Sequence, residues 1–190
     1  MNQLVPGREC GECNVCCKIF GIDKPEIQKQ PGSMCRHCVG GLCEIYQTRP
    51  GVCRTYYCGW RRLGIVEEDW RPDKSGILVE LGDSGTSSPF SSSTALVLVL
   101  IGNPLKTIRQ QRFIEFIVTS LTRKIPLFLS LPGPVGKQAA RLPLNSPEVL
   151  EAVRQSRNHV RLALEKALKR LAAHEYLPYS TTHSGNDVST

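Results

Sequence analysis

The amino-acid sequence predicts an α+β protein: a loop-rich, metal-held cysteine module packed on a small β-sheet with a helical crossover and a long C-terminal helix. Three observations lead to this fold class. All nine cysteines lie between Cys10 and Cys58. The apolar run 95–101 (ALVLVLI) has the length and composition of a strand that is buried on both faces. The segments 105–121 and 146–174 place apolar residues at helical spacing.

Residues 1–62 form the predicted cysteine module. This segment is dense in Cys, Gly, Pro and Arg and has little apolar periodicity. It cannot build much of a core, so we expect its order to depend on bound metal. Short helical turns are expected at 13–20 and 25–29, with loops elsewhere.

Residues 63–177 form the second predicted part, a small α/β unit with a C-terminal helix. Its expected strands are 76–81, 95–101 and 125–131, each rich in branched residues. Because a helix is expected over 105–121, between the last two strands, these strands should be joined by a right-handed crossover.

The C-terminal helix begins at a clear signal, Ser146-Pro147-Glu148. A hydroxyl cap, a proline in the first turn and an acid near the positive end of the helix dipole all favour a helix start there. The helix is expected to continue to about residue 174. Residues 178–190 are expected to form a disordered tail, and the Gly/Ser-rich segment 82–93 a mobile loop.

The cellular context favours metal ligands over disulfides. Met1–Arg8 lacks the apolar segment of a secretory signal, and the run 95–101 is far shorter than the roughly 20 residues that span a bilayer. We therefore expect a cytoplasmic protein without membrane contact. In a reducing cytosol, clustered cysteines are more often metal ligands than disulfide partners.

The formal net charge of +7 does not by itself predict a nucleic-acid partner. Residues 1–62 carry nine Lys or Arg and five Asp or Glu, a surplus of four. Two Zn²⁺ ions on eight thiolates would add −4 and neutralise that surplus. Residues 63–190 add a surplus of only three, fifteen minus twelve. Nucleic acid is therefore not expected, a protein partner stays open, and no oligomeric state is predicted.

The cysteines fall into three groups. The first group is Cys10-x2-Cys13-x2-Cys16-Cys17. A Cys-x2-Cys turn presents two thiolates toward one point, as in zinc and iron–sulfur sites. Adjacent Cys16 and Cys17 cannot easily point at one small ion, so one of them should serve a second metal or another corner of a cluster. The other two groups are Cys35-x2-Cys38-x4-Cys43 and Cys53-x4-Cys58.

Arginines and aromatic residues are interleaved with the last two groups. Arg49 and Arg54 can donate hydrogen bonds to sulfur or offset its negative charge, although both could instead be solvated. Tyr56 and Trp60 are expected to cover the metal site as a small hydrophobic lid. His37, the one histidine in this region, is expected to be solvated rather than a ligand.

The combined spacing resembles the YkgJ-type cysteine-cluster family over residues 10–60. The matching pattern is Cys-x2-Cys-x2-Cys-Cys, then Cys-x7-Cys-x-Ile-Tyr-x2-Arg-Pro-x2-Cys-Arg-x-Tyr-x-Cys. That family is described as a zinc- or iron-chelating domain. The resemblance implies eight ligands: Cys10, Cys13, Cys16, Cys17, Cys35, Cys43, Cys53 and Cys58. Cys38 falls where many members have an apolar residue, and it is a ninth candidate ligand, a reactive thiol or a packing residue.

Two metals suit these cysteines. Zinc favours closed tetrahedral sites of four thiolates, and eight cysteines divide into two of them. An iron–sulfur cluster also takes four thiolates, and the Cys-x2-Cys-x2-Cys run suits a cubane. We favour an iron–sulfur cluster with a redox or cofactor-handling role. The alternatives are a zinc-stabilised structural module that binds a protein or nucleic-acid partner without catalysis, and metal storage or delivery.

An enzymatic activity stays open at this stage. Some members of the family are labelled Fe–S oxidoreductases, and a flagellin lysine methylase resembles them in this motif. Neither label selects a reaction for this chain, and residues 76–174 carry no motif that does.

Overall fold

The computed structural model describes residues 4–83 and 94–179. At its centre lies a four-stranded mixed sheet in the order β5-β6-β7-β8. Its strands are β5 (Ile77–Asp83), β6 (Thr94–Leu100), β7 (Leu127–Leu131) and β8 (Ala140–Pro143). Only β6 and β7 pair in parallel, while the other two pairs are antiparallel. The predicted α+β class is confirmed, and β8 is a strand that the sequence did not predict.

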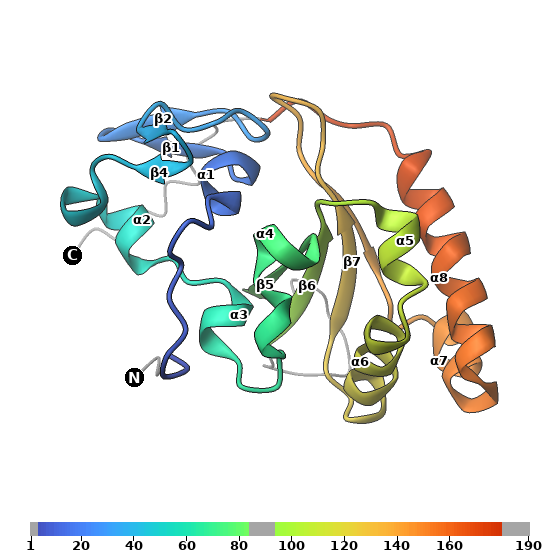
Figure 1. The fold of residues 1–190 in the computed structure, drawn as a ribbon. Helices are drawn as coiled ribbons and strands as arrows, with labels where there is room; N and C mark the ends of the chain where they lie inside the picture. Colours follow the sequence, from blue (N-terminus) through green and yellow to red (C-terminus); the bar gives the residue numbers. More distant parts are fainter. Residues whose placement is uncertain (1–3, 84–93, 180–190) are drawn as a thin grey trace, which may run out of the picture.

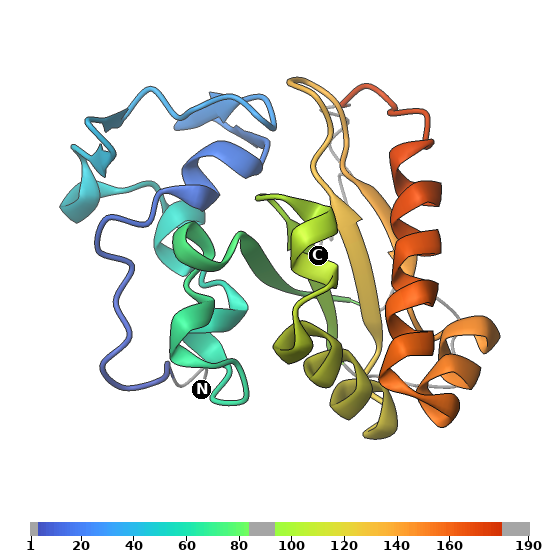
Figure 2. The same ribbon diagram turned by 45° about the vertical axis from the view of Figure 1, so that its right-hand side comes forward.

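Four helices cover one face of this sheet (Figures 1 and 2). They are α5 (Pro104–Ile108), α6 (Gln111–Thr122), α7 (Pro147–Gln155) and α8 (Arg157–Ala172). The first two connect the parallel strands β6 and β7, so the predicted helical crossover is present.

Both helices that were predicted as continuous are broken, which corrects two expectations. The expected helix 105–121 is interrupted between α5 and α6. The expected helix 146–174 is interrupted at Ser156, which adopts an extended conformation (φ −168°, ψ 165°). The Ser156 hydroxyl accepts a hydrogen bond from the N–H of His159 (3.3 Å) and so caps α8. A residue that competes for backbone N–H groups in this way ends one helix and begins the next.

The sheet is buried on both faces at its centre. No side chain from Ala95 to Leu100 is more than 4% exposed, which confirms the doubly buried strand predicted here. Val79 and Leu98 belong to the main core that includes the helices. On the opposite face, Leu78 and its neighbours in β6 pack against an N-terminal helix, α1 (Val15–Ile19).

The cysteine module lies on that opposite face (Figure 2). After α1 it contains two small hairpins, β1 (Ile22–Lys24) with β2 (Ile27–Lys29), and β3 (Cys38–Val39) with β4 (Leu42–Cys43). Then follow η1 (Tyr46–Thr48), α2 (Gly51–Thr55) and α3 (Gly59–Arg62). The expected turn at 13–20 corresponds to α1. The helical turn expected at 25–29 is wrong, because Ile27 turns inward (3% exposed) as part of a strand.

Residues 63–75 connect the cysteine module to β5 and also contribute to the core. They contain η2 (Glu68–Trp70) and α4 (Pro72–Ser75), and Val66 and Trp70 are fully buried in the main core. Trp60, from the cysteine module, belongs to the same core. The two parts are therefore joined by a shared apolar contact.

Two further expectations concern the C-terminal tail (178–190) and the Gly/Ser-rich loop (82–93). Of the predicted tail, Pro178 pairs with Lys137 in an isolated bridge, and the N–H of Tyr179 donates to the carbonyl of Gly136 (2.9 Å). Residues 180–190 and most of the predicted mobile loop (84–93) lie outside the described residues. Within the described ranges, no helix has the length and apolar character needed to cross a membrane.

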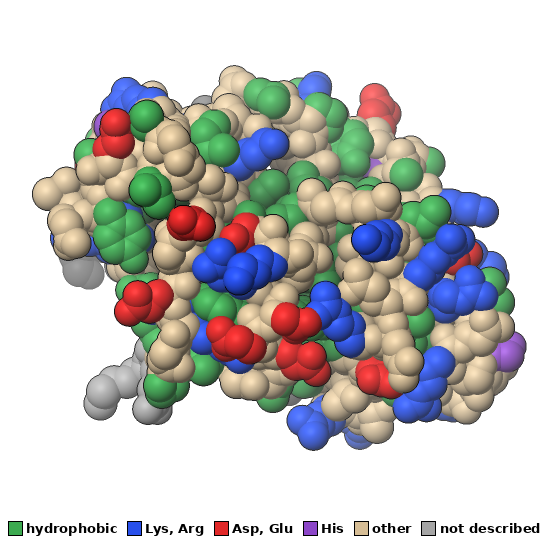
Figure 3. Space-filling view, viewed as in Figure 1, with side chains coloured by type: hydrophobic (Ala, Val, Ile, Leu, Met, Phe, Trp, Pro, Cys, Tyr) green, Lys and Arg blue, Asp and Glu red, His purple; other side chains and the backbone are tan. Residues whose placement is uncertain are grey.

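Charge is unevenly distributed over the surface. Basic side chains gather over α5 and α8 in Figure 3, and acidic ones lie nearer the cysteine module. Part of the basic surface is balanced by ion pairs, since Glu165 binds both Arg109 (2.9 Å) and Arg161 (3.1 Å).

Candidate metal centre

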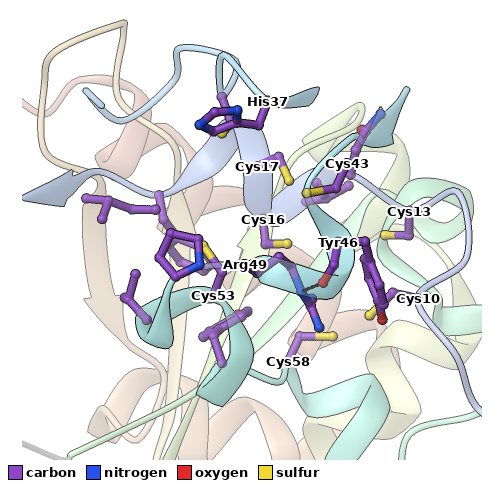
Figure 4. Close-up of a pocket in the computed structure, with 18 of the residues that line it drawn as sticks. Cys10, Cys13, Cys16, Cys17, His37, Cys43, Tyr46, Arg49, Cys53 and Cys58 are labelled. Atoms are coloured by element: carbon purple, nitrogen blue, oxygen red, sulfur yellow. Dashed lines mark hydrogen bonds between the residues drawn. The ribbon is translucent and has the colours of Figure 1, made fainter. Parts of the chain in front are cut away.

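A cavity of about 290 Å³ lies between the cysteine module and the sheet (Figure 4). Leu78 of β5 forms part of its wall, together with apolar side chains of the module. Eight cysteines line the cavity: Cys10, Cys13, Cys16, Cys17, Cys35, Cys43, Cys53 and Cys58. Cys38 does not line it. All nine cysteines are free thiols, and each is partly exposed.

Short elements bring these cysteines together from 49 residues of chain, Cys10 through Cys58. The Cys13 N–H donates to the carbonyl of Cys10 (2.9 Å), which closes a tight turn at Gly11 (φ 52°). Glycine adopts this left-handed conformation without steric cost. Helix α1 carries Cys16 and Cys17, β4 carries Cys43, and α2 carries Cys53. Cys58 immediately precedes α3.

The thiols surround the cavity rather than converge on one point (Figure 4). In the part of the chain that the structure describes, no three Cys, His, Asp or Glu side chains are close enough together to hold one metal ion. A group that used these thiols would therefore have to span the space between them, or draw them inward on binding.

The thiols differ in how readily they ionise. Cys16 donates a hydrogen bond to Cys17, which raises the pKa of Cys16 and lowers the pKa of Cys17 to about 6. Burial raises the pKa of Cys13 to about 11. Metal ligation requires the thiolate, so metal binding at this cavity would release protons from Cys13 and Cys16, whose pKa values are raised.

Two cations line the same cavity. Lys29 donates hydrogen bonds to the carbonyls of Lys18 (3.3 Å), Phe20 and Gln30 (3.1 Å). Arg49 donates to the carbonyl of Tyr46 (3.0 Å) and lies over its ring, with 3.8 Å between the guanidinium carbon and the ring centroid. Both side chains can offset the negative charge of thiolates.

The other predicted site residues divide between the cavity and the surface. Arg54 is exposed and does not line the cavity, so its proposed action on the sulfur atoms stays a prediction. His37, expected in solvent, lines the cavity instead. Lys29 was missed, because only the folding of the hairpin β1–β2 over α1 brings it to the thiols. No spacing in the sequence relates it to a cysteine motif.

The predicted aromatic lid is half correct. Tyr56 lines the cavity, but Trp60 belongs to the main core (3% exposed), where its Nε1–H donates to the carbonyl of Glu68 (2.9 Å). The Tyr56 hydroxyl is buried and has no hydrogen-bond partner among the described residues. Burial raises its pKa, so the hydroxyl remains protonated. An unpaired buried donor beside thiols fits a site whose sulfur atoms carry negative charge.

Comparison with known proteins identified no relative from which a function could be inferred. No protein-family model matches this chain, and neither a curated protein nor a solved structure matches it. The class of protein is thus defined by the molecule itself: an α+β chain whose small cysteine module encloses a thiol-lined cavity against a sheet.

Proposed function

We propose that this chain is a metal-binding protein that holds an iron–sulfur cluster, or zinc, on up to eight thiolates, as the resemblance to the YkgJ-type family implies. One observation carries the proposal. The eight cysteines of the motif line a single cavity, and the ninth cysteine, Cys38, does not. If the cysteines had no shared role, there would be no reason for the cavity to be lined by the eight motif cysteines and not by Cys38.

The poor apolar packing of the module supports the same reading. Among the described residues 4–58, only Arg8 and Ile27 are buried. So little burial cannot offset the conformational entropy lost on ordering about fifty residues. Bound metal would supply the missing stabilisation, as it does in other small metal-held modules.

The separation of the thiols favours a cluster over separate ions. Zinc binds four thiolates that close around one point at about 2.3 Å, and no three side chains of the described chain do so. An iron–sulfur cluster presents several irons to separated thiolates and supplies one-electron redox chemistry when bound. Lys29 and Arg49 would offset its negative charge, and the Tyr56 hydroxyl would donate a hydrogen bond to sulfur.

Elemental analysis and a visible spectrum of the full chain, purified without oxygen, test this proposal. Iron and sulfide with a broad visible absorption would support a redox or cofactor-handling role. Zinc without colour would support the alternative, a zinc-stabilised structural module that binds a partner without catalysis. The Cys38→Ser variant should keep the metal and Cys58→Ser should lose part of it. Protein that contains no metal and takes up none would refute the proposal.

A further inference from the structure

The hairpin β3–β4 places Cys38 opposite Cys43. Its two-residue loop is Gly40-Gly41, and both glycines have positive φ angles (57° and 85°), as the type I′ turn of a two-residue hairpin requires. This turn fixes the register of the two strands, in which Cys38 pairs with Cys43. The spacing of four residues around Gly-Gly therefore brings the two cysteines side by side across the hairpin.

Cys38 and Cys43 form the kind of cross-strand pair in which side chains approach most closely. The N–H of Glu44 donates to the carbonyl of His37 (2.9 Å), so backbone hydrogen bonds flank the cysteine pair and do not run between its two members. Residues in such a pair have Cα atoms about 4.5 Å apart and point to the same face. A disulfide spans Cα separations of roughly 4.4–6.8 Å. The two sulfur atoms can therefore bond without a change in the register of the hairpin.

Cys38 is the member of the pair that is open to attack from solution. It is partly exposed and lies outside the cavity, whereas Cys43 lines the cavity. The hairpin lies on the side of the module away from the sheet (Figure 2). Val39 and Leu42, beside the two cysteines, are 53% and 54% exposed. An oxidant in solution therefore reaches Cys38 first, with Cys43 behind it as the second thiol.

We propose that Cys38 and Cys43 are a reversible modification site, at which a low-molecular-weight disulfide such as oxidised glutathione generates a cross-strand disulfide. The Cys38 thiolate attacks one sulfur of the small disulfide, whose S–S bond breaks and releases one thiol. The Cys43 thiolate then attacks the Cys38 sulfur of the mixed disulfide and releases the second thiol. The two cysteines are oxidised, the small disulfide is reduced to two thiols, and these thiols take up the two protons that the cysteines lose.

A disulfide between Cys38 and Cys43 would remove one of the eight thiols that line the cavity. This consequence rests on the proposed function, whereas the pairing itself does not. Metal bound to the Cys43 sulfur would in turn block the second step, because that sulfur is then not a free thiolate. Metal at Cys43 and the disulfide therefore exclude each other, which gives Cys38 a role although the motif does not include it.

Cys17 is the competing partner, because its thiol is hydrogen-bonded to that of Cys38. Peptide mapping separates the two possibilities. Cleavage after Lys, Arg and Glu leaves Cys38 and Cys43 together in the peptide 37–44, whereas Cys17 lies in the peptide 13–18. A disulfide within the peptide 37–44 is the expected result. A cross-link between the two peptides would overturn the pairing.

The experiment uses the full chain, both as purified and after treatment with a chelator. Each sample is incubated with graded ratios of oxidised to reduced glutathione, alkylated and digested. We expect the disulfide within 37–44 in the chelator-treated chain, and slower formation where metal is bound. Cys38→Ser and Cys43→Ser should abolish it, and Cys35→Ser, a matched control in the same segment, should retain it. Gly41→Val disfavours the left-handed turn and should require about tenfold more oxidised glutathione.

The outcomes separate this inference from the proposed function. Absence of the disulfide from both samples would overturn the inference, and a chain that still holds metal would keep the proposed function. Equal yields in the wild type and Gly41→Val would also overturn it, because closeness in sequence alone would then explain the bond. A chain that forms the disulfide but never holds metal would support the pairing and refute the proposed function. Metal content that the disulfide leaves unchanged would refute the exclusion at Cys43.

Discussion

Gly59 is the position where a single added methyl group should push helix α3 away from strand β5. It is buried at the start of α3, immediately after Cys58. A Cβ atom added there would lie 2.5 Å from Cγ1 of Val79, 2.8 Å from its Cβ and 3.1 Å from its carbonyl oxygen. Val79 is fully buried in β5, so its side chain has little room to turn away. Gly59→Ala should therefore move α3 away from β5.

The cost follows from overpacking a filled core, which is about 1–3 kcal/mol. With a value of about 2 kcal/mol, Gly59→Ala should lower the melting temperature by roughly 4–8 °C for a chain of this length. Gly51→Ala is the matched control: it also lies at the first residue of a short helix, but its added Cβ would meet nothing within 4 Å. That variant should melt within about 2 °C of the wild type, as expected for an open surface site.

Urea unfolding of both variants, with the metal content held equal, measures the difference. Because Cys58 precedes Gly59, the same movement should also weaken metal retention at the Cys58 thiol. Equal stability of Gly59→Ala and the wild type, within about 0.5 kcal/mol, would refute the close packing of α3 on β5. Equal losses in both glycine variants would instead point to a general effect of substitution in the module.

Three further predictions concern charged side chains. Arg8 is buried and donates to the carbonyls of Trp60 (2.6 Å), Leu63 (3.2 Å) and Val66 (2.6 Å). Because Arg8→Met leaves these acceptors unpaired, it should lower the free energy of unfolding in urea by about 3 kcal/mol or more. The control Arg54→Met, at an exposed position, should leave that free energy unchanged. Burial raises the pKa of Glu80 above its ordinary value of 4.5, against the opposing effect of Arg141. Since the folded state then holds this proton more tightly than the unfolded state, wild-type stability should fall as pH rises above about 4.5. Glu80→Gln should therefore be more stable than the wild type at pH 7 and lose this advantage at pH 4. The same difference in unfolding free energy at both pH values would show that burial does not raise the pKa of Glu80. Finally, Lys29→Met should weaken metal retention against a chelator by about tenfold, while Lys24→Met, an exposed site in the same hairpin that does not line the cavity, should leave it unchanged.

The sequence predicted the elements whose signal is local. The run 95–101 is apolar at every position, as expected for a strand buried on both faces, and β6 is such a strand. The break at Ser156 was missed because the apolar positions on either side keep a helical spacing across it. Strand β8 was missed for a different reason. Its sequence, ARLP, is short and ends in proline, and only its position at the edge of the sheet makes it a strand.

The candidate site was predictable in its ligands but not in its surroundings. Cysteine spacing, together with the family resemblance, selected the eight thiols that line the cavity and separated Cys38 from them. Lys29 reaches the cavity only because the hairpin β1–β2 folds over α1. Leu78 lines the cavity only because the sheet packs behind the module. Trp60 was assigned to the lid because it is close to Cys58 in sequence, whereas its indole ring points into the main core.

Helix α1 connects the cavity to the sheet, because it contributes side chains to both. Val15 and Ile19 are four residues apart and so share one side of the helix, which packs on the sheet with Leu78. Cys16 and Cys17 line the cavity from the same five-residue helix. So short a helix is not stable alone and needs contacts on both sides. Thiolates fixed by metal would hold α1 in place from the cavity side, and the apolar contact holds it from the sheet side. If the chain holds metal as proposed, its removal should therefore also uncover Leu78, Val97 and Val99 on the sheet.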